Sequence, residues 1–323
     1  MLLNQLAGRR ALFVGGKGGV GKTSVASALA LAAARGGERV LVVSTDPAHN
    51  LGHLWERPVG ERPTPLWRGA GRVDGIEIDP AATVERHLAA VGSTMTRLLP
   101  ERLHGAARAH LEAAREAPGT HESAALEAVA DALAMGLAEY DRVVFDTAPS
   151  GHTLHLLASP ERMTTWAENL LSNRDRSERF SAAYGALGGT RDTSDRDAEL
   201  RRVLRRRRER FAAMRDALAD PRVAGFVLVF VPEPLPIAES REVAEELARI
   251  GIPLVAAVAN RLSPEALPAR RAREEALLAG LDLGAPVTRV PLVDDLVGLP
   301  ALDAIGPHLG GPDRQSGPST ASS

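Results

Sequence analysis

The chain has 323 residues, of which 44% are hydrophobic and 25% are charged, a composition that is ordinary for a soluble globular protein. Its formal net charge of −2 provides no global basic field for nucleic acid or an anionic membrane, and no apolar run approaches the ~20 residues needed for direct membrane insertion. The chain contains no cysteine, which excludes disulfides, thiolate zinc sites, iron–sulfur clusters and a cysteine nucleophile.

The first sixty residues are predicted to form a βαβ unit. Residues 11–14 (ALFV) are expected to form a short buried strand, and residues 23–34 an Ala- and Leu-rich helix that Gly36 and Gly37 end. The next strand is predicted at residues 39–45 (RVLVVST). The apolar run 11–14 is too short for a signal peptide and leads into glycines, so a cytoplasmic protein is expected.

Three later apolar runs have the same character as these strands, at residues 142–147, 224–231 and 252–260. They are rich in Val, Leu and Phe without alternation, a pattern typical of a parallel sheet covered on both faces. Helical patterns at residues 238–250 and about 265–279 separate them. The sequence therefore predicts an α/β fold with a doubly wound, mostly parallel sheet.

Two insertions, at about residues 80–140 and 160–220, are almost wholly helical in pattern. We expect them to pack together as an inserted helical subdomain within one domain that covers residues 1–305. The tail at residues 306–323 has too little apolar surface to fold and is predicted to be disordered. The basic run at residues 201–210 includes Glu209 and has acidic neighbours, which favours a solvated helix face over binding to RNA or lipid headgroups.

The segment Gly16–Thr23 (GKGGVGKT) lies between a predicted strand and a predicted helix and fits the phosphate-binding pattern G-x-x-x-x-G-K-[ST]. Its glycines let backbone N–H groups approach phosphates, and the start of the following helix adds partial positive charge. Lys22 is expected to contact the β- and γ-phosphates, and the Thr23 hydroxyl to coordinate Mg²⁺. The chain is therefore predicted to be a P-loop ATPase that binds and hydrolyses Mg²⁺·ATP. The nucleotide-binding residues predicted here are Gly16, Lys17, Gly18, Gly19, Val20, Gly21, Lys22, Thr23 and Ser24.

Lys17 and Lys22 are the only lysines among 39 basic residues. An ordinary P-loop accepts almost any residue in place of Lys17, and the form GKGGVGKT resembles the deviant P-loop of the arsenite-pump, septum-site and partition ATPases. The resemblance implies that Lys17 reaches the phosphates of the partner subunit's ATP across a homodimer interface. The alternative is a solvated loop lysine.

The segments at two predicted strand ends indicate which branch of this ATPase class the chain resembles. Asp46, in STDPAHNL (44–51), follows a predicted strand and can orient a water for in-line attack on the γ-phosphate. Asp146 ends the strand VVFD and can lie near Mg²⁺ through a water, although a strand-end Asp also commonly caps a following helix. The segments STDPAHNL and DTAPSGHTLHLL (146–157) resemble the arsenite-pump and tail-anchored-protein-targeting ATPases. The catalytic residues predicted are Lys17, Lys22 and Asp46, and the Mg²⁺ residues are Thr23 and Asp146.

Two segments near the end of the chain resemble the adenine pocket of the same family, VANRL (258–262) and VPLVDD (290–295). The resemblance implies that the amide of Asn260 pairs with the base edge and that the Pro291 segment covers the ring. A turn residue at a strand end is the alternative for Asn260. Because no internal repeat is visible, one nucleotide site is expected.

The chain also departs from its relatives. It lacks the cysteines that bind the metalloid in the arsenite pump and the CxxC pair that clamps the eukaryotic targeting dimer through zinc. The histidines near the switch segments, His49, His152 and His155, are interpreted as loop residues that bond backbone rather than as a zinc site. The large apolar residues of the insertions are few among many Arg and Glu, which favours a packed helical core over a groove for a transmembrane helix.

The sequence leaves three functional hypotheses. The first is a homodimeric ATPase that captures or delivers a hydrophobic protein segment, with hydrolysis moving the helical subdomains. The second is the energising subunit of an anion efflux system with a membrane partner. The third is a spatial organiser like the septum-site protein, which the Gly/Pro/Ser-rich tail disfavours because it offers no amphipathic membrane-binding helix.

Overall fold

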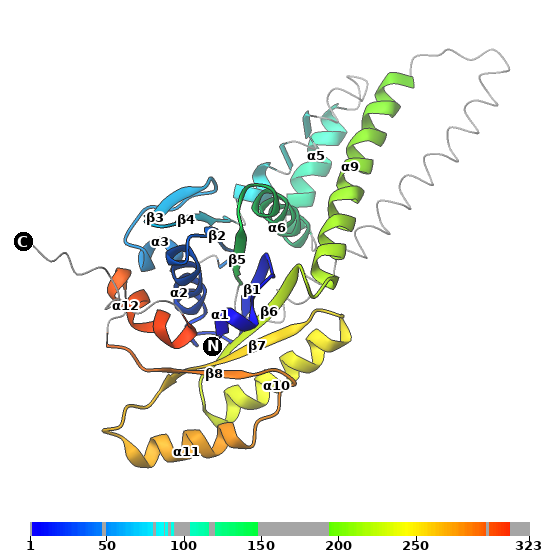
Figure 1. Cartoon of the computed structure of the whole chain (residues 1–323). Coiled ribbons are helices and arrows are strands. Elements are labelled where there is room, and N and C mark those ends of the chain that lie inside the picture. The colour runs from blue at the N-terminus through cyan, green and yellow to red at the C-terminus, as the bar shows by residue number, and fades with distance from the viewer. Residues whose placement is uncertain are drawn as a thin grey trace, which may run out of the picture. The chain divides into compact units, whose positions relative to one another are not determined.

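The computed structural model describes residues 2–46, 50–79, 82–86, 88–89, 92–93, 104–115, 120–147, 194–294 and 297–310 (Figure 1). The chain divides into two compact units. The sheet unit comprises Met1–Asp79, Ala132–His155 and Ala217–Ser323, and the helical unit comprises Pro80–Asp131 and Leu156–Asp216. Much of the second predicted insertion, the segment 148–157 and His49 lie outside the described residues.

The strands of the sheet unit are β1 (Ala11–Gly15), β2 (Arg39–Ser44), β3 (Thr64–Arg68), β4 (Arg72–Glu77), β5 (Arg142–Asp146), β6 (Ala224–Phe230), β7 (Leu254–Leu262) and β8 (Val287–Pro291). They form one eight-stranded sheet in the order β3-β4-β2-β5-β1-β6-β7-β8. Neighbouring strands are parallel, except that β3 runs antiparallel to β4. The predicted α/β fold with a mostly parallel sheet is therefore confirmed.

The helices of the sheet unit are α1 (Leu2–Gln5), α2 (Lys22–Arg35), α3 (Asn50–Leu54), α10 (Pro234–Arg249), α11 (Pro268–Ala279), α12 (Gly298–Ile305) and the 3₁₀ helix η2 (Gly306–Leu309). α2 and α12 lie on one side of the sheet, and α10 and α11 cover β6–β8 on the other (Figure 1). Most of α2 is buried, because the sheet covers one face and α12 and η2 pack against it from outside. Its many alanines allow this close approach, since they bury no polar group and need little space.

Five strands of the sheet, β1, β2, β5, β6 and β7, were predicted from the sequence. The strands β3, β4 and β8, which lie toward the two ends of the strand order, were not predicted. β1, β2, β5 and β6 are apolar and buried along almost their whole length, which gives the strong signal used above. β3 and β8 are edge strands with partly exposed residues, so their sequences resemble loops. The predicted disordered tail also begins too early: Gly306–Leu309 form η2, and the Leu309 side chain is fully buried in the main core.

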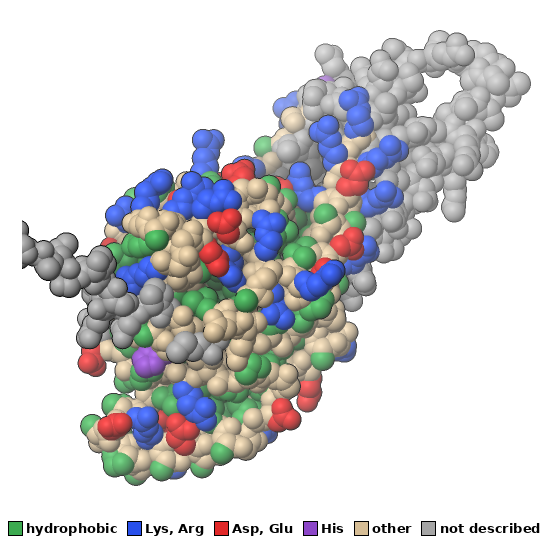
Figure 2. All heavy atoms as spheres, viewed as in Figure 1, with side chains coloured by type: hydrophobic (Ala, Val, Ile, Leu, Met, Phe, Trp, Pro, Cys, Tyr) green, Lys and Arg blue, Asp and Glu red, His purple; other side chains and the backbone are tan. Residues whose placement is uncertain are grey.

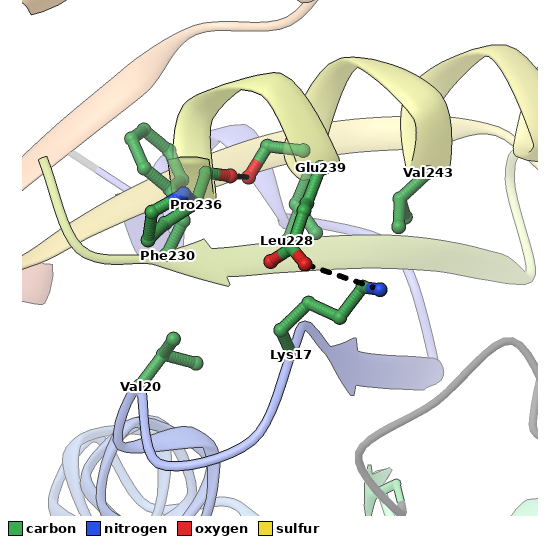
Figure 3. Close-up of a pocket in the computed structure, with 8 residues that line it drawn as sticks. Lys17, Val20, Leu228, Phe230, Pro236, Glu239 and Val243 are labelled. Atoms are coloured by element: carbon green, nitrogen blue, oxygen red, sulfur yellow. Dashed lines mark hydrogen bonds and ion pairs between the residues drawn. The ribbon is translucent and has the colours of Figure 1, made fainter. Parts of the chain in front are cut away.

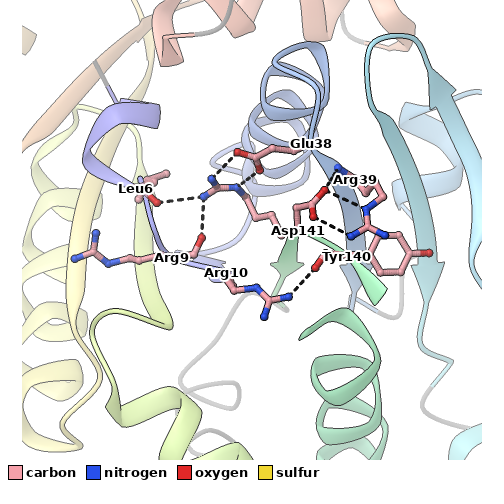
Figure 4. A network of polar contacts seen from close by, with 8 residues as sticks. Leu6, Arg9, Arg10, Glu38, Arg39, Tyr140 and Asp141 are labelled. Atoms are coloured by element: carbon pink, nitrogen blue, oxygen red, sulfur yellow. Dashed lines mark hydrogen bonds and ion pairs between the residues drawn. The ribbon is translucent and has the colours of Figure 1, made fainter. Parts of the chain in front are cut away.

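A network of charged side chains ties the amino ends of the central strands together (Figure 4). Arg142, at the start of β5, is 7% exposed and donates to both carboxylate oxygens of Glu38 at 2.7 and 2.9 Å. Its Nη1 also donates to the carbonyls of Leu6 at 3.2 Å and Arg9 at 3.0 Å. The network joins the segment before β1, the segment before β2 and β5. Because its members are paired, it can hold a guanidinium inside the fold without an orphaned charge.

The helical unit contains α5 (His104–Arg115) and parts of two helices that continue into the sheet unit, α6 (Thr120–Glu139) and α9 (Ser194–Ala219). Its described apolar cluster is small, with Val84, Leu88 and Ala124 buried and Leu111 packed against them. Figure 2 shows basic side chains along α9 with acidic side chains among them. Arg210 pairs with Asp131 at 2.7 Å, and Arg202, Arg205 and Arg206 are exposed, as expected for a solvated helix face.

Candidate functional site

The phosphate-binding loop follows β1 and leads directly into α2, as predicted. Gly16 has a φ of 151°, and a Cβ atom there would collide with the carbonyl oxygen of Val229 on β6. Gly21 has a φ of 91°, and a Cβ atom there would collide with the side-chain amide of Asn260. Only glycine fits both positions, because each combines a left-handed or extreme backbone with a close neighbour. The loop is thus fixed between β6 and the end of β7.

Asn260 helps to hold this loop. Its Nδ2 donates to the Val20 carbonyl oxygen at 2.8 Å, and the residue is 5% exposed. This contact joins residues 240 positions apart and was not predicted from the sequence, which assigned Asn260 to the base of the nucleotide. The contact uses one of the two N–H donors of the amide. The other N–H and the carbonyl oxygen remain for a contact with the base, which stays a prediction.

Lys22 is the first residue of α2 and lies inside the curve of the loop. It is 6% exposed, and its Nζ donates to the carbonyl of Lys17 at 3.1 Å. Burial lowers its pKa, whereas the nearby carboxylates of Asp146 and Asp46 act to raise it. The structure therefore brings together the predicted lysine and both predicted carboxylates.

Asp146 ends β5 beneath the loop and is fully buried. Burial raises its pKa to about 7, against the opposing effects of the Thr23 hydroxyl and the Lys22 ammonium. Neither carboxylate oxygen accepts a hydrogen bond of regular geometry from a residue that the structure describes. A buried carboxylate that accepts no such hydrogen bond, together with a neighbouring hydroxyl, offers oxygen ligands of the kind that a hard cation such as Mg²⁺ prefers.

The described residues contain no cluster of three or more His, Cys, Asp or Glu side chains that could hold a metal ion. Mg²⁺ does not need such a cluster, because it commonly keeps several waters and takes its remaining oxygens from one or two side chains and the substrate phosphates. Thr23 and Asp146 therefore fit as the residues that would hold Mg²⁺.

Asp46 lies just beyond the end of β2 and is half-buried. Its backbone N–H donates to the Ser44 hydroxyl at 3.3 Å, and one of its carboxylate oxygens accepts from Nδ2 of Asn50 at 3.4 Å. The next three residues of the predicted switch segment, 47–49, lie outside the described residues. Asp146 ends β5, and Asp46 lies two residues beyond the end of the neighbouring parallel strand β2, so both lie where the carboxyl ends of these strands meet.

Lys17 points toward Glu239 on α10 (Figure 3). Its Nζ lies 3.3 Å from a carboxylate oxygen of Glu239, and the two side chains are 46% and 26% exposed. Because both are partly in water, the pair is weak, on the order of 1 kcal/mol or less. Glu239 was not singled out from the sequence. The two lysines of the loop therefore have different neighbours: Lys22 lies near Asp46 and Asp146, whereas Lys17 pairs with Glu239.

A cavity of about 430 Å³ adjoins the loop on the side of β6–β8. Neither Asn260 nor Pro291 lines it, although Arg261 and Leu292, which follow them directly, do. Pro291 is the last residue of β8 and pairs with Leu262 of β7. The residues that line the cavity include Gly18, Gly19, Arg261, Leu267, Arg270 and Leu292.

The chain was compared with known protein families and sequences. Residues 9–305 match the sequence model of a family described as anion-transporting ATPases. The chain belongs to this family. The resemblance drawn from the loop and switch segments is confirmed.

Individual relatives of this family match to different extents. The ATPase ASNA1 homolog of Trypanosoma cruzi is 32% identical over 327 residues, which cover 92% of this chain and 90% of that protein. The arsenical pump-driving ATPases of Acidiphilium multivorum and Escherichia coli are 33% and 32% identical over 278 residues. Those matches cover 84% of this chain but only 42% of either pump ATPase, so the chain spans less than half of their length.

The family assignment fits the geometry of the loop. An ATPase needs a phosphate cradle, a cation beside it and a carboxylate beneath it, and the loop, Lys22 and Asp146 provide these groups. Within the part of the chain that the structure describes, no helix is long and apolar enough to span a membrane.

Proposed function

We propose that the chain is a homodimeric ATP-driven switch that couples binding and hydrolysis of Mg²⁺·ATP to the capture and delivery of a client, a hydrophobic protein segment. The observation that carries this proposal is the match over nine tenths of the ATPase ASNA1 homolog, against less than half of the arsenical pump-driving ATPases. In this proposal one chain supplies one nucleotide site, and pairing with a second copy brings two sites together.

In this proposal each predicted site residue has a separate role in ATP hydrolysis. Lys22 and the loop amides bind and orient the phosphates, and Thr23 with Asp146 would hold Mg²⁺. Mg²⁺, when bound, neutralises charge on the phosphate oxygens. Asp46 accepts a hydrogen bond from the attacking water and holds it in line with the γ-phosphate.

Lys17 supports the homodimeric part of the proposal. Its ammonium lies on the α10 side of the loop, at the ion pair with Glu239. A lysine with this placement is available to a second subunit that approaches the loop. We propose that it leaves Glu239 when the subunits close and contacts the phosphates of the partner's ATP.

The second candidate is the energising subunit of an anion efflux system. The family description and the names of the two pump ATPases favour it. Against an arsenite pump stands the composition of the chain, because soft thiolate ligands suit As(III) and the sequence contains no cysteine. The client hypothesis and the pump hypothesis therefore require different binding sites on this chain, and two experiments distinguish them.

The first experiment tests client capture. The Asp46→Asn variant is expected to bind ATP but hydrolyse it very slowly, and so to retain a client in the presence of ATP. A soluble carrier protein fused to a single apolar segment of about 20 residues should co-elute with this variant in ATP and dissociate in ADP.

The same carrier with two arginines inside the segment is the matched control. Retention of both carriers, or of neither, would contradict capture of a hydrophobic segment.

The second experiment tests metalloid chemistry. Arsenite and antimonite are expected to leave the rate of ATP hydrolysis unchanged, because no thiolate is available to bind them. The measurement is phosphate release across a micromolar titration of each metalloid, with the apolar carrier as a positive effector. Stimulation by the metalloid in the absence of the carrier would favour the pump and contradict the client hypothesis.

A further inference from the structure

The short helix α3 holds one side of the Asp46 carboxylate. One carboxylate oxygen of Asp46 accepts from Nδ2 of Asn50, the first residue of α3, at 3.4 Å. The backbone N–H of Asp46 donates to the Ser44 hydroxyl at the end of β2 at 3.3 Å. The sheet fixes the second contact, because Ser44 is fully buried and pairs with both neighbouring strands. The first contact is only as well placed as α3 itself.

A buried glutamate anchors α3 to the sheet. Glu77 is the last residue of β4, is 5% exposed and lies in register with Ser44 of β2. Its Oε1 accepts from the backbone N–H of Gly52, the third residue of α3, at 3.0 Å. An N–H in the first turn of a helix has no acceptor within that helix, and this carboxylate supplies one. Glu77 therefore ties α3 to the strand beside β2.

Gly52 allows this close approach. A Cβ atom there would lie 2.9 Å from the Arg57 carbonyl oxygen and 3.8 Å from Oε2 of Glu77. The first distance is too short for a Cβ atom, so a larger residue would push α3 away from its anchor. The Gly52 carbonyl also accepts from the Arg57 N–H at 3.0 Å, which closes a turn after α3. Both polar groups of the Gly52 backbone are therefore held.

The carboxyl end of α3 has an anchor of its own. Trp55 follows α3 and is 5% exposed, and its Nε1 donates to the buried Ser27 hydroxyl on α2 at 3.0 Å. Leu51 and Leu54 pack into the main core. Because apolar packing is not directional, the hydrogen bond to Glu77 sets the position of the amino end of α3, which bears Asn50.

We propose that Glu77 is a positioning residue for ATP hydrolysis, which holds the amino end of α3 so that Asn50 keeps the Asp46 carboxylate in place to orient the attacking water. The inference rests on the function proposed above for Asp46. Burial of a carboxylate is unfavourable unless hydrogen bonds compensate it, and an ionised acceptor holds an N–H more strongly than a neutral one. Glu77 touches neither the nucleotide nor the water and acts only through α3.

The Glu77→Ala variant tests this role through the rate of hydrolysis. Its kcat should fall about 10- to 100-fold, because a displacement of about 1 Å at a reacting group costs up to this factor. Its Kd for ADP should be unchanged, since the phosphate loop is intact. Glu77→Gln keeps an oxygen acceptor for the Gly52 N–H and should restore kcat to within about fivefold of the wild type.

Glu38→Gln is the matched control. It weakens the carboxylate that pairs with Arg142 at the opposite, amino edge of the same sheet. This variant should therefore lower the melting temperature without changing kcat, which separates a loss of stability from a loss of positioning.

The decisive measurement repeats Glu77→Ala in the Asp46→Asn background, by single-turnover phosphate release. If Glu77 acts through Asp46, the double variant should hydrolyse ATP at the rate of Asp46→Asn, within about twofold. An unchanged kcat in Glu77→Ala alone would overturn the inference. An equal loss in both backgrounds would also overturn it, because Glu77 would then act independently of Asp46.

Gly52→Ala carries the test if Glu77→Ala does not fold. Its Cβ atom displaces α3 from the same contact, so kcat should fall in the wild-type chain and not in the Asp46→Asn background. An unchanged kcat in Gly52→Ala would contradict the proposal. Failure of the proposed function has a different signature, since Asp46→Asn alone would then hydrolyse ATP at the wild-type rate.

Discussion

Lys22→Ala is expected to abolish ATP hydrolysis and to weaken ATP binding. The ammonium of Lys22 is buried between the loop and two carboxylates, where it balances the charge of phosphates that would otherwise face Asp46 and Asp146 alone. Loss of a preorganised charge of this kind lowers kcat by on the order of 10²–10³, and the effect on this site should be at least that large. Phosphate release and calorimetric ATP binding measure the two effects.

Lys17→Ala is the matched control for this prediction. It removes the other lysine of the same loop, and ATP binding to a single subunit should survive because Lys22, Thr23 and the loop amides remain. Near-normal rate and affinity in Lys22→Ala, with the fold verified by circular dichroism, would refute the phosphate-loop assignment.

Mixing two inactive variants is expected to restore activity if Lys17 acts on the partner's ATP. Each Lys17→Ala homodimer lacks the lysine at both sites, and each Asp46→Asn homodimer lacks the water-orienting carboxylate at both sites. In a mixed dimer, one site combines Asp46 from one chain with Lys17 from the other, so up to half of the wild-type activity should return. A cation supplied by a partner in this way is worth about 10³–10⁵ in rate in GTPases.

Subunit exchange and the arginine variant control this experiment. Exchange is verified by co-purification of differently tagged chains in ATP. Lys17→Arg should be nearly as damaging as Lys17→Ala, because a wide planar guanidinium does not replace a slim ammonium. If activity stays near zero despite confirmed exchange, Lys17 serves its own subunit's ATP and the trans mechanism is wrong.

The sequence predicted the parts of the site that depend on short segments. The phosphate loop is local, so its glycines, Lys22 and the start of α2 could be placed from eight consecutive residues. Asp146 was placed because it ends an apolar run of the kind that forms a buried strand, and the structure puts it at the end of β5.

Features that depend on distant partners were not predictable. The contact of Asn260 with Val20 joins residues 240 positions apart, and nothing in either segment indicates the other. The pairing of Lys17 with Glu239 depends on how α10 packs against β6. The left-handed backbone of Arg261 carries no signal because arginine, unlike glycine, gives no hint of such a conformation.

The charged network around Arg142 has a consequence for how β5 tolerates substitution. This five-residue strand has Arg142 at one end and Asp146 at the other, on the order of 13 Å apart at the rise of a parallel strand. Arg142 stabilises the fold through its four donated hydrogen bonds. Asp146 is a buried carboxylate that accepts no hydrogen bond of regular geometry from the described residues, and this burial destabilises the fold.

The two ends of β5 are therefore under opposite physical constraints. Loss of the arginine removes a structural anchor, while loss of the aspartate removes an unfavourable buried charge together with the proposed Mg²⁺ residue. Enzymes commonly carry such a destabilising group at the site of reaction and offset it elsewhere in the fold. In this chain one short strand carries a stabilising charged group at one end and a destabilising one at the other, so a substitution at either end of β5 is expected to shift the melting temperature in opposite directions.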